Sequence, residues 1–144
     1  MPRALFALLL LASAAQAADP LTIDVHRDPN CGCCTAWIEH LQHNGFVVND
    51  HLESDMPALK QRLGVPPSLA SCHTGVIDGK FVEGHVPAAD ILTLRQRPDL
   101  LGAAVPGMPT GSPGMERGNV RDAYQVIGVD KQGQATVITQ YPGN

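Results

Sequence analysis

Four cysteines and a neighbouring histidine are the residues of this chain most suited to chemistry. They are Cys31, Cys33 and Cys34 in the segment DPNCGCC, and Cys72, which is followed by His73. Thiolate and imidazole groups are soft ligands that select copper(I), zinc or iron–sulfur centres over oxygen-loving cations. Cys31 and Cys34 also form a C-x-x-C pair, which at a helix N-terminus is typical of thiol–disulfide exchangers. Soft-metal binding and thiol–disulfide exchange are therefore both candidate chemistries.

The local backbone decides how the three close thiols would share a metal. Successive helical side chains diverge by about 100°, so a fully helical segment could not direct all three at one tetrahedral ion. We expect either that Cys31 and Gly32 lie outside the helix, with the glycine in an unusual conformation, or that the thiolates bridge several ions. A helix N-terminus here would lower the pKa of the thiols and favour the thiolate form.

Copper and zinc are the metals that this ligand set favours. Thiolates that bridge Cu(I) ions would use all four cysteines, and imidazole also accommodates Cu(II). Zinc would prefer a closed four-ligand site, made here of Cys31, Cys34, Cys72 and His73, which would leave Cys33 without a role. Copper is therefore the leading prediction and zinc the alternative.

Other histidines and methionines are weighed as further ligands. His73 adjoins Cys72, but neighbouring side chains of an extended chain point to opposite faces, so its role stays open. His85, in EGHVP, is a candidate ligand or else a capping or surface residue. Met108 and Met115 recur in two PGM tripeptides; thioethers suit Cu(I), although pinning a loop is the simpler role. The remaining predictions are a structural or outer role for His40, exposed positions for His26, His43 and His51, and a core position for Trp37.

The chain begins with the features of a secretory signal peptide. Arg3 precedes an apolar run over residues 4–14, and Ala15-Gln16-Ala17 is an A-x-A cleavage site. The run is shorter than the roughly 20 residues that span a bilayer. We therefore expect residues 1–17 to be removed, which leaves one periplasmic domain, residues 18–144, without membrane insertion. A net charge of −4 and scattered basic residues argue against nucleic acid as a partner.

In an oxidising compartment four cysteines would ordinarily form two disulfides. A Cys33–Cys34 bond would close a strained ring, and a Cys31–Cys33 bond would be too short for relaxed geometry. The comfortable bridges are Cys31 to Cys34, and Cys72 to a cysteine of the cluster.

Hydrophobic periodicity and turn residues predict alternating strands and helices. Strands are predicted over residues 21–26 and from 46 to 48, helices over 34–43 and 56–63, a hairpin of 74–77 and 80–82, a third helix over 87–97, a loop over 102–118, and a final hairpin of 124–129 and 135–140. The predicted order is β-α-β-α-β-β-α with a two-stranded extension.

This order, with C-x-x-C opening the first helix after the first strand, resembles the thioredoxin fold. The resemblance implies an α/β domain with a central mixed sheet, flanking helices and, here, a C-terminal hairpin extension. Thioredoxin-like proteins place a cis-proline before the third strand, where this chain has Cys72-His73-Thr74. The chain also departs from an exchanger in having Asn30 before the first cysteine and Cys33 within the pair. In such a fold Cys72 would lie beside Cys31 and Cys34.

Four motifs occur in order along the chain: DPNCGCC followed by Trp37 and His40, LGVPPSLASCHTG, EGHVPAADI, and AVPGMPTGSPGME. Together they resemble the CopG-like family, small periplasmic proteins found with copper-resistance systems and formerly of unknown function. The resemblance covers nearly all of residues 18–144. It implies a thioredoxin-like domain that binds copper in periplasmic copper handling, with redox chemistry on the bound metal as one mode of action. Carried over by position, it puts Cys31, Cys33, Cys34 and Cys72 in the metal site.

Three functions stay open. The leading prediction is a periplasmic protein of copper resistance that sequesters or converts copper, with copper ions and other copper-handling proteins as partners. Coupled oxidation of metal and thiols would add copper oxidoreductase activity to sequestration. The second is a thiol–disulfide oxidoreductase that uses Cys31 and Cys34, against which the missing cis-proline and the extra thiols count. The third is a zinc-stabilised or disulfide-stapled interaction domain.

Overall fold

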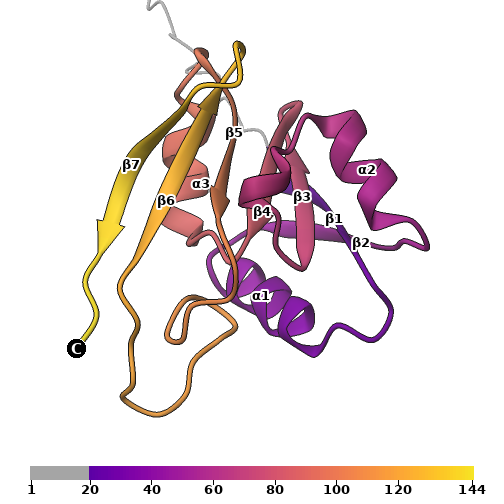
Figure 1. Ribbon diagram of the computed structural model, residues 1–144. Coiled ribbons are helices and arrows are strands. Elements are labelled where there is room, and N and C mark those ends of the chain that lie inside the picture. Colours follow the sequence, from indigo (N-terminus) through magenta and orange to yellow (C-terminus); the bar gives the residue numbers. More distant parts are fainter. Residues whose placement is uncertain (1–19) are drawn as a thin grey trace, which may run out of the picture.

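The computed structural model describes residues 20–144, so the predicted signal peptide, residues 1–17, lies outside the described part of the chain. Over residues 20–144 the chain forms a mixed α/β structure with a seven-stranded sheet and three α-helices (Figure 1). In chain order the elements are β1 (Thr22–Arg27), α1 (Gly32–His43), β2 (Val47–Leu52), α2 (Met56–Leu63), a 3₁₀ turn (Pro67–Leu69), β3 (His73–Ile77), β4 (Lys80–Gly84), α3 (Ala88–Arg95), β5 (Leu100–Val105), β6 (Tyr124–Asp130) and β7 (Ala135–Tyr141). None of the helices in this range has the length and apolarity needed to cross a membrane.

The sheet order explains how cysteines far apart in the sequence meet. The strands lie in the order β2-β1-β3-β4-β5-β6-β7, in which β1 is parallel to β2 and β4 to β5, and the other neighbours are antiparallel. Since β1 and β3 are antiparallel, the end of β1 lies beside the start of β3, and Arg27 pairs with His73. The chain leaves β1 toward Cys31 and enters β3 from Cys72, so both segments lie at the same end of the sheet.

Helix α1 begins at Gly32, and Cys31 precedes it as the N-cap residue with extended dihedral angles. Gly32 is helical and has no positive φ, so the expectation that it lies outside the helix in an unusual conformation is wrong, whereas Cys31 does lie outside. The buried face of α1 consists of Cys34, Trp37, Ile38 and Leu41. Burial of a large apolar side chain contributes roughly 1.5–3 kcal/mol, so this face holds the first turn of α1 at the end of the sheet.

Two predictions from local signals are confirmed. Helix α2 spans Met56–Leu63 as expected; Asp55 accepts the Ala58 N–H at its start, and Gly64 ends it with a φ of 77°. The β3–β4 hairpin turns at Asp78 and Gly79, whose φ angles are 51° and 73°. Positive φ at both central residues is the signature of the tight turn that an Asp-Gly pair favours.

The predicted loop over residues 102–118 is wrong at its start, because Leu100–Val105 form strand β5. This strand pairs with both β4 and β6 and joins the final hairpin to the sheet. Small residues such as Gly102 are common in loops, but those of β5 are buried. A Cβ atom at Gly102 would lie 2.4 Å from the Phe81 ring. The small residue is therefore required by close packing of an aromatic ring against the strand.

Candidate metal centre

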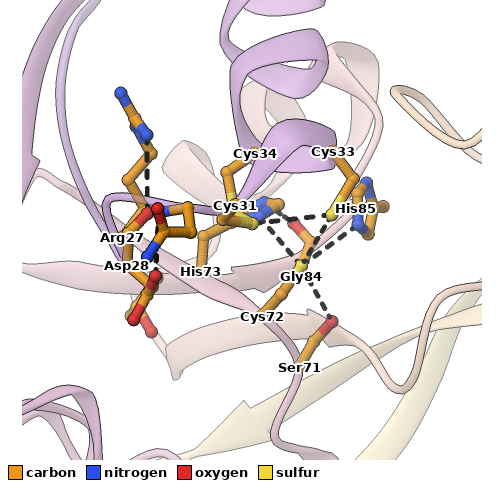
Figure 2. The surroundings of a disulfide bond; sticks show 12 residues. Arg27, Asp28, Cys31, Cys33, Cys34, Ser71, Cys72, His73, Gly84 and His85 are labelled. Carbon is orange, nitrogen blue, oxygen red and sulfur yellow. Dashed lines mark hydrogen bonds between the residues drawn. A yellow bond between two sulfur atoms is a disulfide. The ribbon is translucent and has the colours of Figure 1, made fainter.

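Sulfur atoms from the start of α1 and the start of β3 meet at one end of the sheet (Figure 2). Cys31 and Cys34 form a disulfide, while Cys33 and Cys72 are free thiols. The Cys33 Sγ lies 3.5 Å from both the Cys31 Sγ and the Cys72 Sγ, and all four sulfur atoms lie within 4.8 Å of one another. The expectation that Cys72 lies beside Cys31 and Cys34 is confirmed.

Two buried imidazoles also face Cys72. The Nδ1 of His73 lies 3.4 Å and the Nε2 of His85 lies 3.3 Å from the Cys72 Sγ (Figure 2). The far ring nitrogens, His73 Nε2 and His85 Nδ1, lie 2.8 Å from the Gly84 carbonyl oxygen and 2.7 Å from that of Pro113, respectively. A carbonyl oxygen only accepts hydrogen bonds, so each far nitrogen carries the proton. In the neutral rings the nitrogens that face Cys72 therefore present lone pairs.

Burial keeps both imidazoles neutral. The pKa of His73 is lowered to about 3, mainly because the ring is desolvated and secondarily because of His85 beside it. The pKa of His85 is also lowered, again mainly by burial. The Trp37 ring lies 4.3 Å from the His73 ring and covers it. Both histidines are therefore neutral at neutral pH rather than cationic.

The two lone pairs compete for a single thiol proton. A soft cation in place of that proton would interact with the Cys72 thiolate and with both imidazoles at once. The carbonyls that hold the far N–H groups are the outer partners that metal-binding histidines usually have. Burial raises the pKa of the Cys72 thiol to about 12, with the neighbouring Cys33 as the second cause, so metal binding at neutral pH would release a proton. The chemistry of these donors fits copper or zinc.

Cys72 belongs to two groups of ligands whose donor atoms lie within 4.8 Å of one another: the four sulfur atoms, and Cys72 with His73 and His85. The closed disulfide removes Cys31 and Cys34 as thiolates, so the free donors of this form are Cys33, Cys72, His73 and His85. The predicted zinc set of Cys31, Cys34, Cys72 and His73 would require reduction of the disulfide first.

Both histidines whose roles the sequence left open lie at the cluster. Cys72 occupies a bend before β3, so the strand rule that separates neighbouring side chains does not apply to Cys72 and His73. His85 follows β4 and is fully buried, which contradicts the alternative of a surface role.

The other predicted residues lie around this cluster or away from it. His40 accepts the N–H of Ala88, the first residue of α3, at 3.1 Å, which is a structural contact. Met108 is 54% exposed and lines a surface groove with Tyr124 and Tyr141, whereas Met115 is half-buried. His43 and His51 are exposed as expected, but His26 is half-buried because it stacks on His51 and pairs with Glu53. Trp37 is a core residue as expected.

The loop after β5 covers the cluster, and sequence reasoning missed its part in the site. Besides the Pro113 carbonyl, the Gly107 carbonyl accepts the Ser71 hydroxyl at 2.6 Å. Gly114 has a φ of 85° and packs closely on α1: a Cβ atom at this position would lie 2.8 Å from the backbone nitrogen of Trp37. Backbone carbonyls carry no side-chain signature, so the sequence marked this loop only through the motif AVPGMPTGSPGME and the PGM repeat within it.

The fold and the site define a mixed α/β protein with a cysteine–histidine cluster able to hold a soft metal. Residues 69–115, which contain Cys72, His73 and His85, match the family described as "Protein of unknown function, DUF411". Two solved structures, described as copper resistance protein CopG, form 1 and form 2, each share 71% sequence identity with the chain at a TM-score of 0.85. The matches cover 87% and 86% of this chain and 100% of each solved chain. No curated protein matches the chain.

The chain therefore belongs to the CopG-like copper-resistance family. Its cysteine cluster is able to bind metal, and both solved structures are described as copper resistance proteins.

Proposed function

We propose that the protein binds copper as its cargo in periplasmic copper resistance. One observation carries the proposal: His73 Nδ1 and His85 Nε2 converge on the Cys72 Sγ at 3.4 and 3.3 Å. Cys33 Sγ, 3.5 Å from the same sulfur, supplies a second thiol. With the disulfide closed, these four residues would hold copper, and after reduction Cys31 and Cys34 would join them. Met108 and Met115 are not needed for either set.

The donor set supports copper in two oxidation states. Thiolates stabilise Cu(I), whereas imidazoles also accommodate Cu(II). Closure of the Cys31–Cys34 disulfide from two thiols releases two electrons and two protons, which is enough to reduce two Cu(II) ions to Cu(I). The protein would thereby change the oxidation state of copper as well as sequester it.

A thioredoxin-like fold and a periplasmic location belong to the same proposal. The fold assignment is supported by the order β2-β1-β3-β4, with a parallel β1–β2 pair and an antiparallel β3–β4 hairpin, and by the C-x-x-C pair at the start of α1. In such a fold Cys72-His73, at the start of β3, would stand at the place where thioredoxin-like proteins have a cis-proline that would exclude a metal. The location is supported by the signal-peptide features of residues 1–17, which would leave residues 18–144 as one domain.

Anaerobic Cu(I) titration of the protein with its disulfide closed, and again after full reduction, tests the proposal, with Zn(II) as competitor. We expect both forms to bind copper and the reduced form to bind more ions per chain. Absence of binding in both forms would refute the copper proposal. Displacement of Cu(I) by equimolar Zn(II) would favour a zinc-stabilised domain instead.

A thiol–disulfide oxidoreductase is the second candidate, and one observation favours it. Cys31 is half-buried at the start of α1 whereas Cys34 is fully buried, the arrangement expected of attacking and resolving thiols. Such an enzyme needs neither Cys33 nor Cys72. It would be favoured if Cys31→Ser abolished the reduction of protein disulfides, while Cys33→Ser and Cys72→Ser kept both this activity and unchanged copper binding.

A further inference from the structure

Glu83 is a fully buried carboxylate on β4, the strand next to β3. Its Oε1 atom accepts the Ser71 N–H at 2.7 Å, and its Oε2 atom accepts the Thr74 hydroxyl at 2.6 Å. Ser71 and Thr74 flank Cys72 and His73, so one carboxylate holds the chain on both sides of two candidate metal ligands.

Lys60 on α2 completes this arrangement. Its ammonium pairs with Glu83 Oε1 and donates to Thr74 Oγ1 at 2.9 Å. The Thr74 hydroxyl thus accepts from Lys60 and donates to Glu83. Loss of the Lys60 ammonium would leave the buried Glu83 carboxylate without its opposite charge, which would strongly destabilise the fold. Because the three side chains are bonded to one another, Lys60, Thr74 and Glu83 form one unit behind the metal centre.

The backbone of β4 adds a further contact. The carbonyl of Gly84, the next residue, accepts the His73 Nε2–H at 2.8 Å and thereby orients the ring. The β3–β4 ladder pairs Thr74 with Glu83, and Ser71 lies before β3. Backbone hydrogen bonds alone hold β3 beside β4. The hydrogen bond from the Ser71 N–H to the Glu83 side chain lies outside this pairing and fixes the segment that carries Cys72.

We infer that Glu83 is a positioning residue of the metal centre. It holds the Cys72 Sγ beside the Cys33 Sγ and presents the His73 Nδ1 to the same place. Its effect on copper rests on the proposed function, but its effect on the two thiols can be measured without metal.

Asp90 supplies a matched control. It is also a buried carboxylate and accepts the hydroxyls of Thr139 and Tyr141. Those partners lie on β7, which β4, β5 and β6 separate from β3. Glu83→Ala and Asp90→Ala each remove a buried carboxylate that accepts two hydroxyl or amide hydrogen bonds, the first beside the candidate metal centre and the second away from it. Glu83→Ala also removes the ion pair with Lys60. Glu83→Gln keeps an acceptor for Ser71 and tests for rescue.

The copper experiment compares Cu(I) affinities of the disulfide-closed variants by competition with a chromophoric chelator, below the unfolding temperature of each. We expect Glu83→Ala to bind copper about 10-fold more weakly, the lower end of the loss caused by removing an outer partner of a metal ligand, because Glu83 acts on the ligands through Ser71 and Thr74. Glu83→Gln should recover most of this loss. Asp90→Ala should unfold more easily than the parent and bind copper as tightly.

The metal-free experiment measures how fast diamide closes a Cys33–Cys72 disulfide while the Cys31–Cys34 bond is intact. Diamide takes up the two electrons and two protons of the thiols. We expect slower closure in Glu83→Ala than in the parent and in Asp90→Ala, because a loosely held thiol has a lower effective concentration at its partner. If Glu83→Ala does not fold, Glu83→Asp, which withdraws the carboxylate by one methylene group, replaces it with the same expected direction.

Closure rates in the Glu83 variant equal to those in Asp90→Ala would overturn the inference, as would equal copper affinities in a parent that binds copper. A parent protein that binds no copper would instead refute the proposed function, and the closure rates would still decide the role of Glu83.

Discussion

His85 lies 13 residues after Cys72 in the chain, yet its Nε2 atom is 3.3 Å from the Cys72 Sγ. The β3–β4 hairpin turns at Asp78 and Gly79 and so brings the chain back to the level of Cys72. The Pro113 carbonyl holds the other ring nitrogen at 2.7 Å, so the ring cannot rotate away without losing a buried hydrogen bond. The hairpin and the loop after β5 therefore act together to present one imidazole to one thiol.

His85→Gln is expected to weaken copper binding because it removes an imidazole nitrogen of the proposed copper site. The loss should be at least as large as the roughly tenfold that removal of an outer partner causes. His43→Gln is the control, since His43 is exposed at the end of α1. Cu(I) affinity and the nitrogen hyperfine couplings of the Cu(II) form check the prediction, and equal values for the two variants would contradict it.

Cys33→Ser and Cys72→Ser are each expected to lower the number of copper ions bound or their affinity. The two sulfur atoms lie 3.5 Å apart, and both are free thiols while Cys31 and Cys34 are bonded to each other. Cys72→Ser should have the larger effect, because Cys72 belongs to both groups of ligands. Copper analysis after gel filtration of the disulfide-closed protein measures the outcome. Copper content equal to that of the parent in both variants would remove Cys33 and Cys72 from the site.

Elements with explicit local signals could be predicted from the sequence. The Asp78-Gly79 turn and the glycine that ends α2 determine the backbone conformation over a few residues. The positions of the β3–β4 hairpin and of α2 could therefore be predicted from the sequence. Strand β5 was expected to be a loop from residue 102 onward, because Gly102 resembles the start of a loop rich in Gly and Pro. The packing of Gly102 against Phe81, a residue of β4, leaves no signal in the local sequence.

The same distinction holds for the candidate site. The closeness of Cys72 to Cys31 and Cys34 follows from the predicted strand order and could be inferred. The environment of His85 could not, because its orientation depends on a carbonyl of a distant loop. Glu83 was missed because a charged residue ordinarily faces solvent. Its burial is offset by the Lys60 ammonium from α2, the Ser71 N–H and the Thr74 hydroxyl, which come together only in the fold.

Acid is expected to destabilise the metal-free, disulfide-closed protein partly through His73. Desolvation lowers the pKa of His73 from 6.5 to about 3, so between these values the unfolded chain binds a proton that the folded chain does not. The contribution is complete above pH 6.5 and falls by roughly 1.4 kcal/mol per pH unit below it. Urea unfolding of the parent and of His73→Gln from pH 7 to pH 4 measures it. The free energy of unfolding of the parent should fall more steeply, and parallel curves would contradict the prediction.

Gly84→Ala is expected to damage both the stability of the fold and the metal centre, whereas Gly79→Ala should affect stability alone. Both glycines have a φ of 73°, so an alanine at either position adopts a left-handed conformation at a cost of roughly 1–2 kcal/mol. A Cβ atom at Gly79 would meet nothing within 4 Å, but at Gly84 it would lie 2.6 Å from the Val105 carbonyl oxygen and 2.7 Å from the Ser71 Cβ. Relief of that overlap moves Ser71, which precedes Cys72, or Gly84 itself, whose carbonyl accepts the His73 N–H. Either shift disturbs the candidate metal centre at a further cost of about 1–3 kcal/mol.

Urea unfolding and Cu(I) titration of the two variants separate these effects. Gly79→Ala should lower the free energy of unfolding and keep the copper affinity of the parent, because its turn lies at the opposite end of the β3–β4 hairpin from Cys72. Gly84→Ala should lower both quantities, and its copper affinity should fall even at a temperature where it is fully folded. Parent-like copper binding in folded Gly84→Ala would show that shifts of Ser71 or of the Gly84 carbonyl do not disturb the metal ligands, and would weaken the case for Glu83 as a positioning residue at the same time.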